Sequence, residues 1–417
     1  MTLPSPLHLF QAYGVELEYM IVDRDTLDVK SIADELIKHE LGEYGSDFEN
    51  GIVTWSNELV MHVVELKSSK PELDFDALRN AFYENIIRIN AILSKWNAML
   101  LPSAAHPFMN PAKETKLWPH DNNEVYAIYN KIFDCSGHGW SNLQSTHLNL
   151  PFANEEEFAK LHAAIRLVLP LLPALCASSP ILDGKDTGFA DTRLTYYKTN
   201  QSHIPSITGQ IIPEAVFSKR EYDDLIFEKI KKDIAPFDPE NILEPVWVNS
   251  RGAITRFDRG SIEIRIMDVQ ECPSADLAII LLVNETLKAL VKEQFIRHKT
   301  QMTWATTPLA QLLDKSIVAG SNAIFDNVEY LKIFGISKNK ASAKEIWESI
   351  INTFVNSGNS NIKNWISELT IILNEGTLSQ RILNALNNDL SKDSLKKVYT
   401  QLAICLAENK MFFSGKI

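Results

Sequence analysis

The stretch GSIEIRIMD, Gly260 to Asp268, decides the fold because its apolar and polar residues alternate. Alternation with a period of two predicts a β-strand with one apolar and one polar face. The polar face would carry a carboxylate and a guanidinium two residues apart. Taken alone, the strand is most simply the solvated outer face of an antiparallel sheet, so companion strands must be sought. The two predicted faces are Ile262, Ile264 and Ile266 on one side, and Ser261, Glu263, Arg265 and Met267 on the other.

Two further segments show the same design. In YGVELEYMIVD the apolar residues occupy the odd positions, which leaves Glu16 and Glu18 together on the opposite face. In THLNLPF two leucines face one way, and His147 and Asn149 face the other. Each pair alone fits a surface strand, but three such strands favour convergence, and their side chains suit Mg²⁺ or Mn²⁺. Carboxylates that converge would repel one another unless cations lie among them.

The segment NELVMHVVELKSSKP offers two more carboxylates, Glu58 and Glu65. Their spacing of seven is odd, so on one regular strand they would point to opposite faces. A bulge, or a position of Glu58 in the loop before the strand, would let both converge. Glu65 is therefore the stronger candidate, and a plain surface position is the alternative for Glu58.

The composition of the chain limits the class of protein to which it can belong and the partners that it can have. The chain has 417 residues, of which 45% are hydrophobic and 23% charged, as in ordinary soluble globular proteins. The net charge of −12 argues against nucleic acid or an anionic membrane as the main partner. Four scattered cysteines suggest neither a disulfide framework nor a zinc ribbon, so we expect a cytoplasmic protein. We find no signal peptide, no membrane-spanning stretch and no P-loop motif.

The pattern along the chain changes once. Strand-like runs interleave with loops and helices up to about Asp268, and from Ser274 onward the pattern is helical to the end. No flexible linker separates the two parts. We therefore expect an α+β catalytic body followed by a helical C-terminal part.

An ordered set of motifs in this chain resembles the glutamate-cysteine ligase families, especially their carboxylate-amine ligase branch. The chain also resembles glutamine synthetase, more distantly. Each motif is weak alone, whereas the ordered set is specific and lies within about the first 275 residues. The motifs are GxExE (Gly14–Glu18), E-x6-E with a proline turn (Glu58–Pro71), HPF (His106–Phe108), HxN (His147–Asn149), SSP (Ser178–Pro180), TRL (Thr192–Leu194) and IEIRxxD (Ile262–Asp268).

The resemblance implies a glutamine synthetase-like α+β fold. Six antiparallel strands would curve into a half-open funnel that binds ATP and two or three divalent metals on its concave face. Residues 1–275 would form the catalytic body, and residues 276–417 a helical part packed on it as one compact unit. Glu263 and Arg265 would be catalytic, with Arg265 neutralising the transferred phosphate. The implied metal ligands are Glu16, Glu18, Glu58, Glu65, His147 and Glu263.

The implied activity is ATP-dependent joining of a carboxylate to an amine, with Mg²⁺ or Mn²⁺ as cofactor. ATP would convert the γ-carboxylate of glutamate into an acyl phosphate, and an amine such as cysteine would then displace phosphate. Both steps bring anions together, which explains why the site needs cations. The carboxylate-amine ligase branch usually has a second histidine at the position of Asn149. In this respect the chain looks more like the true glutamate-cysteine ligases. The identity of the amine therefore stays open.

Three residues are assigned to substrate binding: Arg193, Asn149 and Arg256. Arg193 is a candidate clamp for the amino-acid substrate, with a surface ion pair as its alternative. The expected partners are small molecules, namely glutamate, ATP and an amine or cysteine. Unpaired sheet edges and apolar helix faces also lead us to expect a homodimer.

Two other classes of function are weighed against this one. A phosphotransferase of the guanidino-kinase type would use the same superfamily fold. A non-catalytic scaffold is disfavoured, because every expected ligand position keeps a ligand-capable side chain.

Overall fold

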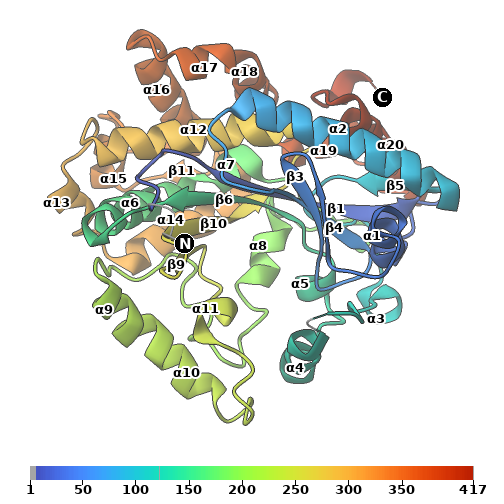
Figure 1. Ribbon diagram of the computed structural model, residues 1–417. Coiled ribbons are helices and arrows are strands. Elements are labelled where there is room, and N and C mark those ends of the chain that lie inside the picture. Colours follow the sequence, from blue (N-terminus) through green and yellow to red (C-terminus); the bar gives the residue numbers. More distant parts are fainter. Residues whose placement is uncertain (1–5, 122, 417) are drawn as a thin grey trace.

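The computed structural model describes residues 6–121 and 123–416. Its centre is an open, antiparallel eight-stranded sheet in the order β2-β3-β4-β1-β6-β10-β9, with β5 also paired to β1 (Figure 1). The six strands that the resemblance implied are too few, because this sheet has eight strands, among them the four-residue strands β2, β5 and β9. The strands are β1 (Gly14–Asp23), β2 (Asp47–Asn50), β3 (Val53–Asn57), β4 (Val63–Ser68), β5 (Ala98–Leu101), β6 (Ser145–Pro151), β9 (Ala253–Arg256) and β10 (Ser261–Asp268).

The apolar face of the sheet is covered by the long helices α2 (Phe75–Leu93) and α12 (Pro273–Val291) (Figure 1). The predicted apolar positions of β1 are buried, and each large side chain contributes roughly 1.5–3 kcal/mol to stability. Both helices begin with expected signals. The Asp74 side chain accepts hydrogen bonds from two backbone N–H groups of α2, and α12 starts at a proline.

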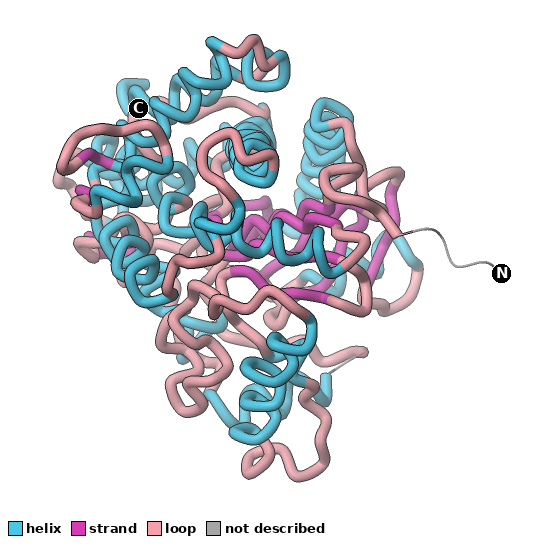
Figure 2. Tube along the Cα trace, turned by 90° about the vertical axis from the view of Figure 1, so that its left-hand side faces the viewer, coloured by secondary structure: helices cyan, strands magenta, loops and turns pink. Residues whose placement is uncertain are grey.

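Shorter helices and loops lie on the opposite side of the sheet, where Figure 2 shows a part of the chain made mostly of loops. Figure 1 shows α4, α5, α8 and the α9–α11 segment on that side. The polar faces of the strands are therefore turned toward this loop-rich side. The bounds of these helices, and of the other helices that precede α12 and have not yet been given, are α1 (Ala33–Leu41), α3 (Pro111–Glu114), α4 (Asn123–Phe133), α5 (His138–Ser141), α6 (Glu155–Val168), α7 (Pro173–Cys176), α8 (Thr192–Tyr197), α9 (Lys219–Tyr222), α10 (Glu228–Ile234) and α11 (Pro245–Val248).

The chain after Ser274 is helical, as predicted, apart from two-residue strands. Most of its helices up to residue 375 share one hydrophobic core with the sheet, whereas the helical residues from Leu378 onward contribute mainly to a second core cluster with Met20, Val22 and Leu101. No helix in residues 6–121 and 123–416 is both long and apolar enough to cross a membrane. The remaining elements are β7 (Ile181–Leu182), β8 (Lys185–Asp186), α13 (His298–Gln301), α14 (Thr306–Ala319), β11 (Ile324–Phe325), α15 (Val328–Ile333), β12 (Ala341–Ser342), α16 (Ala343–Asn356), α17 (Ser360–Asn364), α18 (Ile366–Glu375), α19 (Leu378–Leu386) and α20 (Lys392–Glu408).

Candidate active site

The register of the strands arranges the polar side chains in rows across the sheet. In an antiparallel pair, residues directly opposite each other on one face have Cβ atoms about 4.5–5.5 Å apart. The rows therefore bring acidic side chains from separate strands into contact range. The first row pairs Asp47, Ser56, Glu65 and Glu18; the second pairs Thr54, Lys67, Glu16 and His147; the third pairs Gly14, Asn149 and Glu263.

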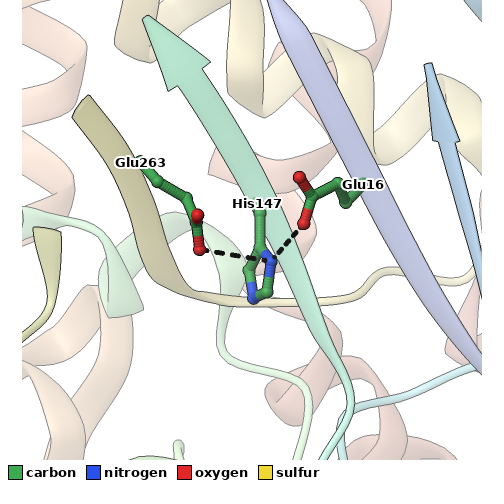
Figure 3. Close-up of side chains that lie close together, drawn as sticks. All are labelled: Glu16, His147 and Glu263. Atoms are coloured by element: carbon green, nitrogen blue, oxygen red, sulfur yellow. Dashed lines mark hydrogen bonds and ion pairs between the residues drawn. The ribbon is translucent and has the colours of Figure 1, made fainter. Parts of the chain in front are cut away.

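His147 lies at the centre of two groups of predicted ligands. Its Nδ1 atom is 2.7 Å from Glu16 Oε2 and 3.7 Å from Glu263 Oε1 (Figure 3). On its other side, Nε2 is 3.8 Å from Glu18 Oε1. One ligand atom from each residue lies within 4.8 Å of the others in both groups. The groups are Glu16, His147 and Glu263, and Glu18, Glu65 and His147.

Glu58 lies in the loop between β3 and β4, which is one of the two placements that would let it converge with Glu65. Burial raises the pKa of Glu58 to about 7, and the nearby charge of Glu18 adds to the rise. Glu58 also raises the pKa of Glu65. The structure thus brings Glu58 into the electrostatic field of the other carboxylates, although it belongs to neither group around His147.

The electrostatics of the site show an excess of negative charge. Burial raises the pKa of Glu65 well above its usual range, and the charges of Glu16 and Glu58 raise it further. Burial also raises the pKa of Glu16, but the hydrogen bond and charge of His147 outweigh this and bring it to about 2. Carboxylates that are buried together in this way are stabilised by bound cations. The donor set, mostly carboxylate oxygen with one imidazole, fits Mg²⁺ or Mn²⁺.

Arg265 lies on the polar face beside Glu263, as predicted. Its Nε and Nη2 atoms are both 3.0 Å from Glu263 Oε1. A β-bulge between Ile264 and Met267 follows. The extra residue reverses the alternation, so Met267 pairs with Thr146 and is buried in the core. Its predicted place on the polar face is therefore wrong.

Arg193 lies in α8, where it is buried rather than open to the polar face. Its Nε atom is 2.5 Å from Asp268 Oδ1, and Nη1 donates to the backbone oxygen of Arg265. The surface ion pair considered as its alternative is wrong, because both partners are buried. Nη2 has no hydrogen-bond partner within the described residues. A substrate contact for Arg193 stays a prediction.

The other two predicted substrate contacts lie on the polar face. Asn149 Nδ2 is 2.9 Å from Glu16 Oε1, so the amide supports a predicted ligand. Gly14 lies opposite, where a Cβ atom would come within 2.9 Å of Asn149 Cβ. This close approach explains the glycine of the GxExE motif. Arg256 lies two residues beyond the position opposite Glu263 and pairs with Asp258 at 3.3 Å.

Sequence reasoning missed three residues of the site. Lys67 Nζ lies 3.5 Å from Glu65 Oε1 and 3.2 Å from Asp47 Oδ1. The backbone N–H of Ser145 donates to Glu18 Oε2 at 2.6 Å. The period of two could have indicated Lys67, which follows Glu65 by two residues. Asp47 and Ser145 become visible only once the strand register is known.

The comparisons with known proteins show the family of the chain and its fold. The family model described as glutamate-cysteine ligase family 2 (GCS2) matches residues 12–401. An uncharacterized protein of Archaeoglobus fulgidus is 29% identical over 402 residues, which cover 96% of this chain and 99% of that protein. A protein of Bradyrhizobium sp. (strain ORS 278), named "Putative glutamate--cysteine ligase 2", is 26% identical over 276 residues. That match covers 65% of this chain and 59% of the relative's length.

Two solved structures share the fold. The glutamate–cysteine ligase of Francisella tularensis, in complex with AMP, superposes with a TM-score of 0.62 at 12% identity, covering 96% of this chain and 89% of that one. A bifunctional glutathione synthetase of Pasteurella multocida also gives 0.62 at 11% identity, covering 95% of this chain and 53% of that one. With the family match over nearly the whole sequence, the conclusion is that this chain belongs to glutamate-cysteine ligase family 2.

Proposed function

We propose that the protein is an ATP-dependent carboxylate-amine ligase that joins the γ-carboxylate of glutamate to an amine such as cysteine. The observation that carries the proposal is the convergence of carboxylates from β1, β4 and β10 on His147, with Arg265 beside them. Membership of glutamate-cysteine ligase family 2 supports the same class of reaction. The AMP in the related Francisella structure supports a nucleotide as one substrate.

The proposed reaction has two steps. An oxygen of the γ-carboxylate attacks the γ-phosphorus of ATP, ADP leaves, and an acyl phosphate forms. The amine nitrogen then attacks the acyl carbon, phosphate leaves with the oxygen that it gained, and the nitrogen loses a proton. Every species in the first step is an anion, so catalysis depends on positioning and on charge neutralisation.

The residues of the polar face have distinct roles in this scheme. Glu16, Glu18, Glu65, Glu263 and His147 would hold divalent cations, which neutralise the phosphates and orient them for in-line transfer. Glu58 is a further ligand in the proposal. A guanidinium has five N–H donors, and Arg265 uses only part of them on Glu263. The others are available to the phosphoryl oxygens that gain charge as the bond to ADP breaks.

The substrate contacts are proposed from the same face. Asn149 would keep Glu16 oriented through its amide. The ion pair between Arg256 and the exposed side chain of Asp258 is weak, so Arg256 would be able to leave it and contact a substrate anion. Arg193 is buried and not open to this face, but its Nη2 atom has no hydrogen-bond partner among the described residues, so we propose that it meets an anionic substrate group only if the substrate reaches it from this face.

A panel assay tests the proposal. Purified protein with Mg²⁺, ATP and glutamate is supplied with cysteine, other amines or hydroxylamine, and ADP and amide products are measured together. We expect ADP and a γ-glutamyl amide in equal amounts with at least one amine, and a hydroxamate with hydroxylamine. ADP formed with a phosphorylated acceptor and no amide would instead identify a phosphotransferase. No turnover with any amine would overturn the proposal.

A further inference from the structure

The bulge in β10 leaves Arg265 outside the regular ladder of the sheet. Arg265 and the next residue, Ile266, together oppose the single residue His147 of β6. The extra residue of a bulge is unpaired on that side, so its backbone needs other partners. The N–H of Arg265 donates to the carbonyl of Gly252 at 3.1 Å, and the carbonyl of Arg265 accepts a hydrogen bond from Arg193 Nη1 at 3.5 Å. Arg193 therefore supports the backbone from which the Arg265 side chain projects.

Asp268, at the end of β10, holds Arg193 in turn. Met267 lies in the core, so the alternation of the strand turns Asp268 to the opposite side, toward α8. Asp268 Oδ1 is 2.5 Å from Arg193 Nε, and the two side chains are 0% and 2% exposed. A carboxylate and a guanidinium that are buried together depend on each other, because either one left unpaired would have a large desolvation cost.

The second carboxylate oxygen of Asp268 binds the turn that precedes α8 in space. Asp268 Oδ2 accepts hydrogen bonds from the backbone N–H of Ser178 at 2.8 Å and from the hydroxyl of Ser179 at 2.9 Å. The Ser179 hydroxyl also accepts a hydrogen bond from the backbone N–H of Arg193 at 3.1 Å. One carboxylate thus joins the end of β10, this turn and the start of α8. An asparagine could not replace it, because an amide has one acceptor oxygen and its NH₂ group would face a donor.

We infer that Asp268 is a positioning residue for the proposed reaction: through Arg193 it fixes the backbone of Arg265, and so the direction of the Arg265 guanidinium. The inference rests on the proposed function, in which this guanidinium binds the phosphoryl group in flight. Misplacing a reacting group by about 1 Å can lower a rate on the order of a hundredfold. Because the phosphoryl oxygens gain charge only in the transition state, the loss should appear in kcat and not in KM.

Steady-state kinetics of Asp268→Asn test the inference. We expect kcat to fall by between about tenfold and about a hundredfold, while KM for ATP and glutamate stays within about twofold of the wild type. In the Arg265→Lys background the same substitution should lower kcat by less than about threefold, because two residues that act through one contact are not additive. Wild-type kcat in Asp268→Asn, or losses that multiply in the double variant, would overturn the inference.

Glu271→Gln is the matched control for the loss of a buried ion pair. Glu271 lies three residues after Asp268 and pairs with Arg381, and the two side chains are as buried as those of the first pair. We expect Glu271→Gln to lower the midpoint of urea unfolding but to keep kcat close to that of the wild type. An equal loss of kcat in both variants would show a merely structural role. Ser179→Ala, which removes one contact of Asp268 Oδ2, should give a smaller loss of kcat with the same lack of additivity, and serves if Asp268→Asn does not fold.

Hydrogen–deuterium exchange gives a second measurement that does not depend on turnover. The peptide that covers residues 261–268 is followed by mass spectrometry in the absence of substrates. We expect its amides to exchange faster in Asp268→Asn than in the wild type or in Glu271→Gln, because the support of the bulge is lost. Unchanged exchange would overturn the inference. Absence of amide product in the wild type would count against the proposed function, and the exchange data would still decide whether Asp268 holds the Arg265 backbone.

Discussion

Replacing Arg265 by lysine isolates geometry from charge at the polar face of β10. Lysine keeps the positive charge but loses the planar fork that spans two oxygens. In the structure, Nε and Nη2 of Arg265 are both 3.0 Å from Glu263 Oε1. One ammonium group cannot hold Glu263 in this way and also bind the transferred phosphoryl group. Removing one such transition-state contact costs about 3 kcal/mol, roughly a hundredfold in kcat.

The assay is ADP release with saturating glutamate, ATP and the preferred amine, beside urea unfolding of the same variants. We expect Arg265→Lys to lose activity while its free energy of unfolding stays close to that of the wild type. Arg259→Lys is the control, because the Arg259 side chain is 70% exposed on the turn between β9 and β10. It should change either quantity by no more than about 0.5 kcal/mol. Wild-type turnover in Arg265→Lys would refute the proposed role of the guanidinium in catalysis.

Three further predictions follow from the site and its surroundings. Excess EDTA should abolish ADP formation, and Mg²⁺ or Mn²⁺ but not Zn²⁺ should restore it, because the donors are mostly carboxylates; full activity in EDTA would contradict this. Gly14→Ala should lower the free energy of unfolding in urea by about 1–3 kcal/mol, since its Cβ would come within 2.9 Å of Asn149 Cβ, whereas Gly137→Ala, with no atom within 4 Å, should have little effect. Burial lowers the pKa of His62 to about 4, against about 6.5 in the unfolded chain, so its contribution to stability is complete above pH 6.5 and is lost as the pH falls toward 4. At pH 5 that loss is on the order of 2 kcal/mol, and His62→Gln should show a shallower decline between pH 7 and 5 in urea unfolding; an unchanged slope would count against it.

Local patterns predicted the strands that carry the site. The alternation in residues 13–23, 146–152 and 260–268 indicated three strands, which the structure confirms as β1, β6 and β10 with ends that differ by at most one residue. A period of two follows from strand geometry itself, so the faces of Glu16, His147 and Glu263 could be read without any tertiary information. The fold class could be predicted for the same reason, with support from the family resemblance.

Features that depend on contacts between distant residues could not be predicted in this way. The bulge in β10 has no local signal in RIM, yet it turns Met267 into the core and places Asp268 beside Arg193. The alignment of Asp47 with Glu65 depends on the register of β2, β3 and β4, which no single strand determines. The spacing of Glu58 and Glu65 left two placements open, and the path of the loop before β4 decided between them.

The central claim is that the γ-carboxylate of glutamate is activated by phosphorylation before the amine attacks. The most direct test is to run the complete reaction with glutamate labelled with oxygen-18 in its γ-carboxylate and to analyse the released phosphate by mass spectrometry. An acyl phosphate passes one carboxylate oxygen to the phosphate, so the account predicts one oxygen-18 atom in each phosphate released with amide product. Unlabelled phosphate formed together with the amide would contradict it.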